Sequence, residues 1–245
     1  MTALIPAAGH GTRFLPLTRA VPKEMLPVGA KPAVQLIVEE ALAAGADDVV
    51  IVISPEKEMI RRYFDGDSEL APRIRYAVQT EQCGLGHAVL QAAETVGRPA
   101  DGVLILLGDA LVSGCVAAAE MSALSRANGG AGVIGLERVP REKISRYGIV
   151  KMEADGRLSD IVEKPRVEDA PSDIAVAGRY LLPTRIFDLL ATQTPGHGGE
   201  IQLTDAIRRL IPENPVYGYV YPGRRHDIGN PDGYFETLAA LRANH

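Results

Sequence analysis

The chain has 245 residues, of which 46% are hydrophobic and 23% are charged, and its formal net charge is -5 at pH 7. This composition is typical of a globular protein with one sizeable core, so we expect a single domain over residues 1–245. The acidic balance disfavours a general nucleic-acid surface, because such surfaces carry a basic excess. No apolar run approaches the roughly 20 residues that span a bilayer, and the N-terminus has no signal-type core. We therefore expect no nucleic-acid partner, no membrane partner and a cytoplasmic location.

The cysteines, Cys83 and Cys115, have neither the spacing of a zinc site nor a histidine cluster beside them. They also cannot form the disulfide framework of a small secreted domain. We expect both to be buried free thiols.

The first half of the chain alternates short apolar runs with helical patterns. Ala3–Pro6 predicts a first buried strand, and Lys31–Ala44 predicts a helix with Gly45 just past its end. The β-branched run "VVIVI" is typical of a strand covered on both faces. Further strands are expected at 48–54, 74–78 and 103–107, and further helices at 56–64 and 86–96. The alternation predicts an α/β fold with a Rossmann-like, doubly wound mixed sheet and helices on both faces.

The second half of the chain has a different pattern. "YGIVKMEADGRLSDIVEKP" contains two strand-like runs joined across Asp155-Gly156, which is a strong hairpin signal. We expect a small β lobe there. Beyond it, strands are predicted at 174–182 and 216–221, and helices at 184–190, 203–211 and 233–243.

The loop after the first strand has the features of a phosphate cradle. Gly9 and Gly11 let backbone N–H groups approach an anion, and prolines nearby would hold Arg13 and Lys23 in place. A dinucleotide fingerprint needs a third glycine where Phe14 stands, and no Gly-Lys-Ser/Thr closes a P-loop. The sequence therefore favours phosphate binding of another kind and disfavours a nicotinamide oxidoreductase.

Motifs along almost the whole chain resemble those of the sugar-1-phosphate nucleotidylyltransferases. Besides the first loop, they are "PKEMLP" (22–27), "GLGHAVLQA" (84–92), "RYGIV" (146–150), "VEKP" (162–165), "GGEIQLTDAI" (198–207) and "HDIGNPDGY" (226–234). "PKEMLP" is most similar to the bacterial members that use UTP and glucose 1-phosphate. The resemblance implies a magnesium-dependent transfer of a uridylyl group from UTP to glucose 1-phosphate, which gives UDP-glucose and pyrophosphate.

The resemblance also implies roles for individual residues. They are catalytic contacts by Arg13, Lys23 and Lys164, nucleotide contacts by Ala8, Gly9, Gly11, Thr12, Gln79 and Gly84, sugar contacts by Gly148, Glu163, Gly178 and Glu200, and Mg²⁺ ligands at Asp109 and Asp227. A nucleotide-binding part is expected over about 1–112, a sugar-binding part over about 113–232 and a terminal helix over about 233–245. A homo-oligomer is expected as well.

Elementary chemistry agrees with such a site. A phosphate monoester with a second pKa near ~6 is already an anionic nucleophile at neutral pH, so no strong general base is required. Magnesium commonly takes one or two carboxylates besides substrate phosphates, and Asp109 and Asp227 each follow a predicted strand. Taken singly, each aspartate would be an ordinary strand-end residue.

Two alternatives remain open from the sequence. One is the same reaction with dTTP or with another sugar phosphate. The other is a catalytically silent nucleotide-sugar-binding regulatory subunit, which loss of Arg13, Lys23, Asp109 or Asp227 would indicate; all four are present.

Overall fold

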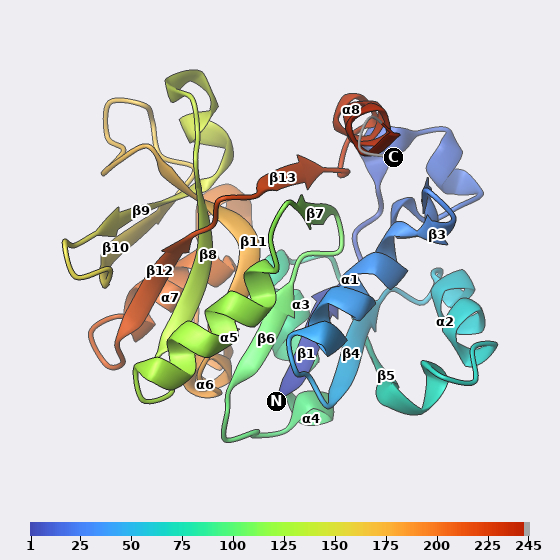
Figure 1. Cartoon of the computed structure of the whole chain (residues 1–245), viewed down its shortest axis with the longest axis horizontal. Coiled ribbons are helices and arrows are strands. Elements are labelled where there is room, and N and C mark those ends of the chain that lie inside the picture. The colour runs from blue at the N-terminus through green and yellow to red at the C-terminus, as the bar shows by residue number, and fades with distance from the viewer. Residues whose placement is uncertain (243–245) are drawn as a thin grey trace.

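A computed structural model describes residues 1–242 of the chain (Figure 1). Its large sheet contains β1 (Thr2–Pro6), β4 (Asp48–Ile53), β5 (Ile74–Val78), β6 (Val103–Leu106), β8 (Gly132–Arg138), β9 (Gly148–Met152), β10 (Leu158–Glu163), β11 (Ile174–Leu182) and β12 (Val216–Val220). Within the described chain these nine strands run in the order β10-β9-β11-β6-β1-β4-β5, and β8 joins β11 to β12. Two short pairs lie outside this sheet: β2 (Pro27–Val28) with β3 (Lys31–Pro32), and β7 (Ala110–Ser113) with β13 (Arg224–Asp227).

The parallel strands β6, β1, β4 and β5 fix the place of the site. β1 pairs in parallel with both β4 and β6, and β4 pairs in parallel with β5. Their carboxyl ends therefore meet at one edge of the sheet, where ligands bind in folds of this kind. At this edge β1 leads into Ala7–Gly9, β5 leads into Gln79, and β6 leads into Gly108 and Asp109.

Helices cover both faces of the sheet, as the sequence predicts. They are α1 (Ala33–Ala43), α2 (Glu58–Asp65), α3 (Leu85–Gln91), α4 (Ala93–Val96), α5 (Ala117–Ala127), α6 (Arg185–Ala191), α7 (Leu203–Leu210) and α8 (Pro231–Arg242). One buried apolar cluster joins the sheet to α3, α4, α6 and α7, and a second joins it to α1, α2, α5 and α8. Figure 1 shows α1 and α5 in front of the strands and α6 and α7 behind them.

Strand β11 connects the two halves of the sheet. Residues 179–182 pair with β6, whereas Ala175 pairs with Ile149 of β9. The register of β11 against β8 shifts between Val176 and Tyr180, where Gly178 has φ +81. The β9–β10 hairpin, predicted as a small lobe, is thus attached to the main sheet through a bend in β11.

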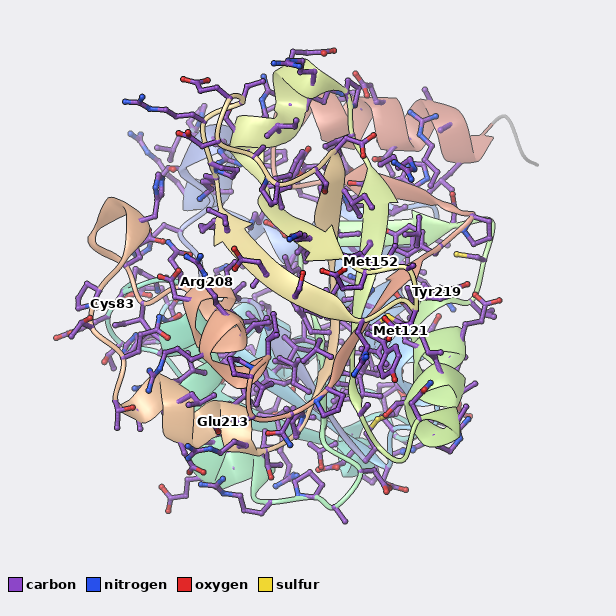
Figure 2. All side chains as sticks on the ribbon, turned by 90° about the vertical axis from the view of Figure 1, so that its left-hand side faces the viewer. Cys83, Met121, Met152, Arg208, Glu213 and Tyr219 are labelled. Atoms are coloured by element: carbon purple, nitrogen blue, oxygen red, sulfur yellow. The ribbon has the colours of Figure 1, made fainter. Side chains whose placement is uncertain are left out.

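The structure also departs from the sequence-based expectations. No element was expected over 110–138, where β7, α5 and β8 lie, and the helix predicted over 86–96 breaks into α3 and α4. Position 243 and the last residues of the expected terminal helix lie outside the described residues. The prediction of buried thiols is wrong: Cys83 and Cys115 are free but only partly buried, because both lie in loops at helix entrances. Figure 2 shows Cys83 at the margin of the molecule. No helix within residues 1–242 is long and apolar enough to cross a membrane.

Candidate active site

Two adjoining cavities open at the carboxyl edge of the parallel strands. The loop-side cavity, of about 250 Å³, is lined by Pro6, Ala8, Gly9, Lys23, Glu24, Gln79, Gln82, Gly84, Leu85, Ala88, Leu107, Gly108 and Asp109. The hairpin-side cavity, of about 200 Å³, is lined by Arg13, Leu85, Leu107, Asp109, Ala110, Arg146, Tyr147, Gly148, Glu163, Val176, Ala177, Gly178, Tyr180, Gln202, Thr204, Arg225 and Asp227. They share Leu85, Leu107 and Asp109, so Asp109 lies at their junction.

The glycine-rich loop after β1 is shaped by local contacts. Gly11 adopts a left-handed φ of +64, and its carbonyl accepts a hydrogen bond of 3.0 Å from Thr18 Oγ1. The short turn Thr12–Phe14 follows, and the buried Phe14 ring packs edge-on against Tyr234. This anchoring leaves Arg13 exposed, where it lines the hairpin-side cavity.

Lys23 and Asp109 form an ion pair at the junction of the cavities. Lys23 Nζ donates to Asp109 Oδ2 over 2.6 Å. Burial is the largest single effect and disfavours both charges. The opposite charges and hydrogen bonds around the pair together outweigh burial, so the pKa of Lys23 is raised and the pKa of Asp109 is lowered. Both groups are therefore charged at neutral pH.

The two predicted metal ligands are brought together by β7 and β13. Asp227 pairs with Ala110 in this ladder, and Ile228 N donates to the Asp109 carbonyl over 2.9 Å. A Cβ atom added to Gly229 would lie 2.9 Å from Asp109 Oδ2 and 3.0 Å from Asp227 Oδ1. The two carboxylates thus flank a cradle that only glycine leaves open. Within residues 1–242 no cluster of three or more potential ligands forms. Paired carboxylates fit a hard divalent cation that also takes phosphate oxygens and waters.

A buried ion pair supports the phosphate loop from behind, and sequence reasoning missed it. Lys57 Nζ donates to Glu24 Oε2 over 2.7 Å and to the Ala7 carbonyl over 2.6 Å. Both side chains are nearly inaccessible, and burial raises the pKa of Glu24 and lowers that of Lys57. The pair ties the segment of Lys23 to the end of β1. Nothing in the local pattern around Lys57 marks it for this place.

The hairpin-side cavity is lined by Gly148, Glu163 and Gly178, three of the residues to which the resemblance gives sugar contacts. Glu163 Oε2 accepts a hydrogen bond of 2.6 Å from Thr204 Oγ1, and a Cβ at Gly148 would lie 3.3 Å from the same oxygen. Lys164 follows with an unusual φ of +43, and its Nζ lies 3.3 Å from Glu163 Oε1. The carboxylate is therefore held beside the cavity with one oxygen oriented by Thr204.

Some predicted residues do not line either cavity, and some unpredicted ones do. Gly11, Thr12, Lys164 and Glu200 are outside both linings. Glu200 lies instead against Gly84, where an added Cβ would be 2.7 Å from the Glu200 Cβ. The residues that were missed in the hairpin-side cavity include Arg146, Tyr147, Gln202, Thr204 and Arg225. Arg225 pairs with Glu137 and lies over the Tyr147 ring. Its place two residues before Asp227 was the available signal.

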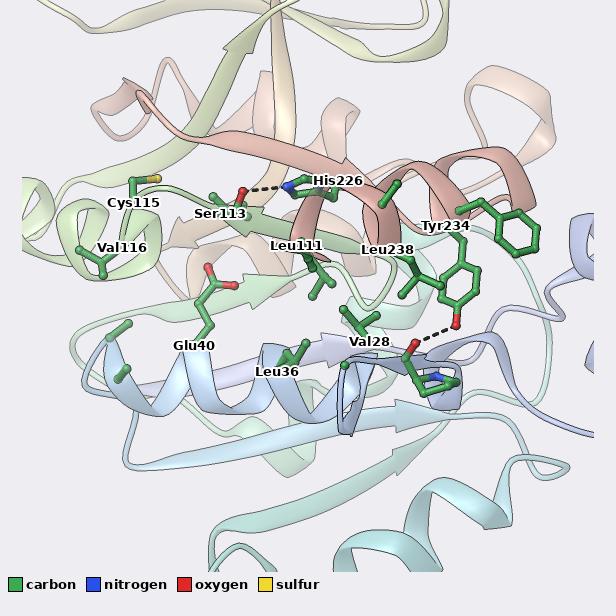
Figure 3. Close-up of a pocket in the computed structure, with 18 of the residues that line it drawn as sticks. Val28, Leu36, Glu40, Leu111, Ser113, Cys115, Val116, His226, Tyr234 and Leu238 are labelled. Carbon is green, nitrogen blue, oxygen red and sulfur yellow. Dashed lines mark hydrogen bonds between the residues drawn. The ribbon is translucent and has the colours of Figure 1, made fainter. Parts of the chain in front are cut away.

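A larger apolar groove lies on another side of the molecule, between α1, α8 and β7 (Figure 3). Its volume is about 1040 Å³, and none of the predicted site residues lines it. Two hydrogen bonds brace its wall, Ser113 Oγ to His226 Nε2 and Tyr234 Oη to the Pro27 carbonyl, each of 2.7 Å. Cavity size therefore does not locate the candidate site, because the charged residues Arg13, Lys23, Asp109 and Asp227 line the smaller cavities.

Comparison with known proteins agrees with this geometry. The family model described as "Nucleotidyl transferase" matches residues 2–244. A UTP--glucose-1-phosphate uridylyltransferase of Staphylococcus haemolyticus is 42% identical, over 96% of this chain and 90% of that protein. The fold and these matches define a transferase of the α/β class. The chain belongs to the nucleotidyl transferase family.

Solved structures share the whole architecture. A UDP-glucose pyrophosphorylase complexed with UDP-glucose superposes with a TM-score of 0.91 at 35% identity, covering 100% of this chain and 99% of that one. A UTP-bound UGPase from Acinetobacter baumannii superposes with a TM-score of 0.88 at 34% identity, covering 100% and 94%. These likenesses extend over both cavities.

Proposed function

We propose that this chain is an enzyme that transfers a uridylyl group from UTP to glucose 1-phosphate, giving UDP-glucose and pyrophosphate. The observation that carries the proposal is the convergence of Lys23, Asp109 and Asp227 where the two cavities meet. It occurs in a chain 42% identical to a named UTP--glucose-1-phosphate uridylyltransferase, and solved relatives carry UTP or UDP-glucose.

In this reaction a phosphate oxygen of glucose 1-phosphate forms a bond to the α-phosphorus of UTP. The bond to the bridging oxygen of the β-phosphate breaks, and pyrophosphate leaves with those electrons. The nucleophile is already anionic at neutral pH, so the protein must chiefly align two anions and neutralise their charge. Arg13 and Lys23 serve the triphosphate, and the backbone of Ala8, Gly9, Gly11 and Thr12 approaches it.

The sugar side is served by the hairpin and the bend of β11. Glu163 accepts sugar hydroxyls, Gly148 and Gly178 let the backbone approach the hexose, and Lys164 meets the sugar phosphate. Glu200 remains a predicted sugar contact. Asp109 and Asp227 would hold a divalent cation, which we propose is Mg²⁺; when bound, it would neutralise charge on the transferring phosphate.

The base of the nucleotide binds beside Gln79 and Gly84. Uracil and thymine present the same N3–H and O4 groups, so dTTP is the nearest competing substrate. The names of the curated relatives favour UTP. A silent regulatory subunit is disfavoured because Arg13, Lys23, Asp109 and Asp227 are all in place. A homo-oligomer remains a prediction from the family resemblance, and a cytoplasmic location remains a prediction from the sequence; light scattering and cell fractionation would test them.

The experiment is a panel of UTP, dTTP, CTP, ATP and GTP, each with glucose 1-phosphate and Mg²⁺, assayed by pyrophosphate release and product chromatography. We expect UTP to give the highest kcat/KM and chelation by EDTA to abolish turnover. A preference for dTTP over UTP would overturn the uridylyl assignment. Release of pyrophosphate without formation of a nucleotide sugar would overturn the transfer reaction.

A further inference from the structure

The side chain of Gln79 is held by the protein at its nitrogen end. Gln79 is only 2% exposed and lines the loop-side cavity. Its Nε2 lies 3.0 Å from His87 Nδ1 and 3.4 Å from the Gly84 carbonyl oxygen. Its Oε1 makes no hydrogen bond within residues 1–242. The oxygen is thus the end of the carboxamide left for a ligand.

A carboxamide has nearly the same shape in both orientations, so its hydrogen-bond partners decide which end faces a ligand. The amide nitrogen of Gln79 carries two hydrogens. His87 Nδ1 and the Gly84 carbonyl are two acceptors for them, and the contact to His87 is the shorter. If His87 were lost, the Gly84 carbonyl alone would favour this orientation, over a long hydrogen bond.

The orientation of this amide distinguishes uracil from cytosine. Uracil has a hydrogen on N3, which Gln79 Oε1 can accept, whereas cytosine has a lone pair on N3, which Oε1 would repel. A turned carboxamide would reverse that preference. We propose that His87 is a positioning residue that acts through Gln79 to admit uracil and exclude cytosine nucleotides. This inference rests on the proposed function, which places the base beside Gln79.

The role proposed for His87 requires one form of its ring. Nδ1 also lies 3.0 Å from the Glu81 carbonyl oxygen, and Nε2 lies 3.1 Å from the carboxamide nitrogen of Gln91. Nδ1 can accept from Gln79 only in a neutral ring with its proton on Nε2. A half-turn of the Gln91 amide presents an oxygen that accepts this proton. A ring with its proton on Nδ1 would donate to Glu81 and would require Gln79 to turn.

The test is the ratio of kcat/KM for UTP to that for CTP, with glucose 1-phosphate and Mg²⁺. His87→Leu removes the acceptor, so we expect this ratio to fall at least ~10-fold, the equivalent of about 1.4 kcal/mol. His87→Asn keeps an acceptor oxygen near the position of Nδ1 and is expected to retain most of the selectivity. Gln91→Leu, at an exposed position, removes the partner of the ring proton and should lower the ratio in the same direction.

Gln82→Leu is the matched control. Gln82 lines the same cavity but donates to the Ala8 carbonyl over 3.1 Å, so its loss should weaken UTP and CTP alike and leave the ratio unchanged. Circular dichroism establishes that each variant folds. Calorimetric binding of UTP and of CTP, without sugar phosphate, gives the ratio of their affinities independently of turnover.

The outcomes separate this inference from the proposed function. If the wild type forms no UDP-glucose from UTP, the proposed function fails. If the wild type prefers UTP and a folded His87→Leu variant keeps its UTP to CTP ratio, only the role of His87 is overturned. A His87→Asn variant as unselective as a folded His87→Leu variant would also overturn it.

Discussion

Lys23 Nζ lies 2.6 Å from Asp109 Oδ2, so the phosphate loop after β1 and the end of β6 share one ion pair. The two residues are separated by 86 positions in the chain. The pair holds a cationic group and a carboxylate at the junction of the two cavities. The charge state of Asp109 therefore depends on Lys23.

The first prediction concerns pH. Lys23 lowers the pKa of Asp109 against the effect of burial, so the ion pair is present at neutral pH and is lost as the pH falls through that lowered pKa. In Lys23→Met, burial is no longer opposed by the ammonium, so the pKa of Asp109 rises relative to the wild type. We expect the acid limb of the kcat/KM profile to move up by about one pH unit. Lys31→Met, which breaks a surface pair with Glu39, is the control. An unmoved acid limb in Lys23→Met would contradict the coupling.

The second prediction concerns the paired carboxylates. Asp109→Asn or Asp227→Asn should lower kcat at least ~100-fold, because each removes a carboxylate that would hold the divalent cation at the transferring phosphate. Asp101→Asn, at an exposed position that precedes β6 whereas Asp109 follows it, should leave kcat unchanged. Steady-state kinetics at saturating Mg²⁺ makes the comparison. A near-normal kcat in either variant would remove that residue from the site.

The third prediction concerns Gly229. An alanine methyl there would lie within 3.0 Å of both carboxylates, so Gly229→Ala should displace them and raise the Mg²⁺ concentration for half-maximal rate at least ~10-fold. The free energy of unfolding should change by less than about 1 kcal/mol, because the carboxylates, rather than the core, give way. Gly66→Ala, whose methyl would make ordinary contacts at the end of α2, is the control. Equal Mg²⁺ requirements in both variants would argue against the cradle.

The fourth prediction separates the backbone of Lys164 from its side chain. Its φ of +43 is strained for a residue with a Cβ, so Lys164→Gly should be more stable than Lys164→Ala by about 1 kcal/mol in urea unfolding. Both variants should raise the KM for glucose 1-phosphate by a similar factor, because both remove the ammonium. An unchanged KM in the glycine variant would show that Lys164 does not meet the sugar phosphate.

The fifth prediction concerns an ion pair between the buried Arg179 and the partly exposed Glu40, near the proposed metal ligand Asp109. Arg179 is 0% exposed, pairs with Glu40 over 2.8 and 2.7 Å, and donates to the Ala110 carbonyl over 2.7 Å. Glu40→Ala should lower the free energy of unfolding by about 3 kcal/mol, because it leaves an unpaired buried guanidinium. The double variant Arg179→Met/Glu40→Leu should be closer to wild type, because it removes both charges. Urea denaturation of the three proteins tests this, and a double variant less stable than Glu40→Ala would contradict it.

The parallel strands were predictable from sequence because short β-branched runs such as "VVIVI" are typical of strands buried on both faces. Helix α5 and strand β8 were missed because an alanine-rich helix and a strand that contains Gly132 and Gly135 have weak periodicity. Asp109 could be placed at a strand end from its neighbours alone. The contacts of Lys57 with Glu24 and of His87 with Gln79 could not be predicted from the sequence, because they depend on how loops from different strands meet.

Because β11 pairs with β6 at one end and with β9 at the other, neither half of this protein carries its own complete sheet. If the chain were cut in the turn between α5 and β8, the first fragment would contain β6 without its partner β11. The second fragment would contain β11 with residues 179–182 no longer paired to β6. Such fragments would be expected to fold only on each other. For the same reason, a chimera that takes residues 113–232 from a relative would also need the relative's residues on β6 that contact β11.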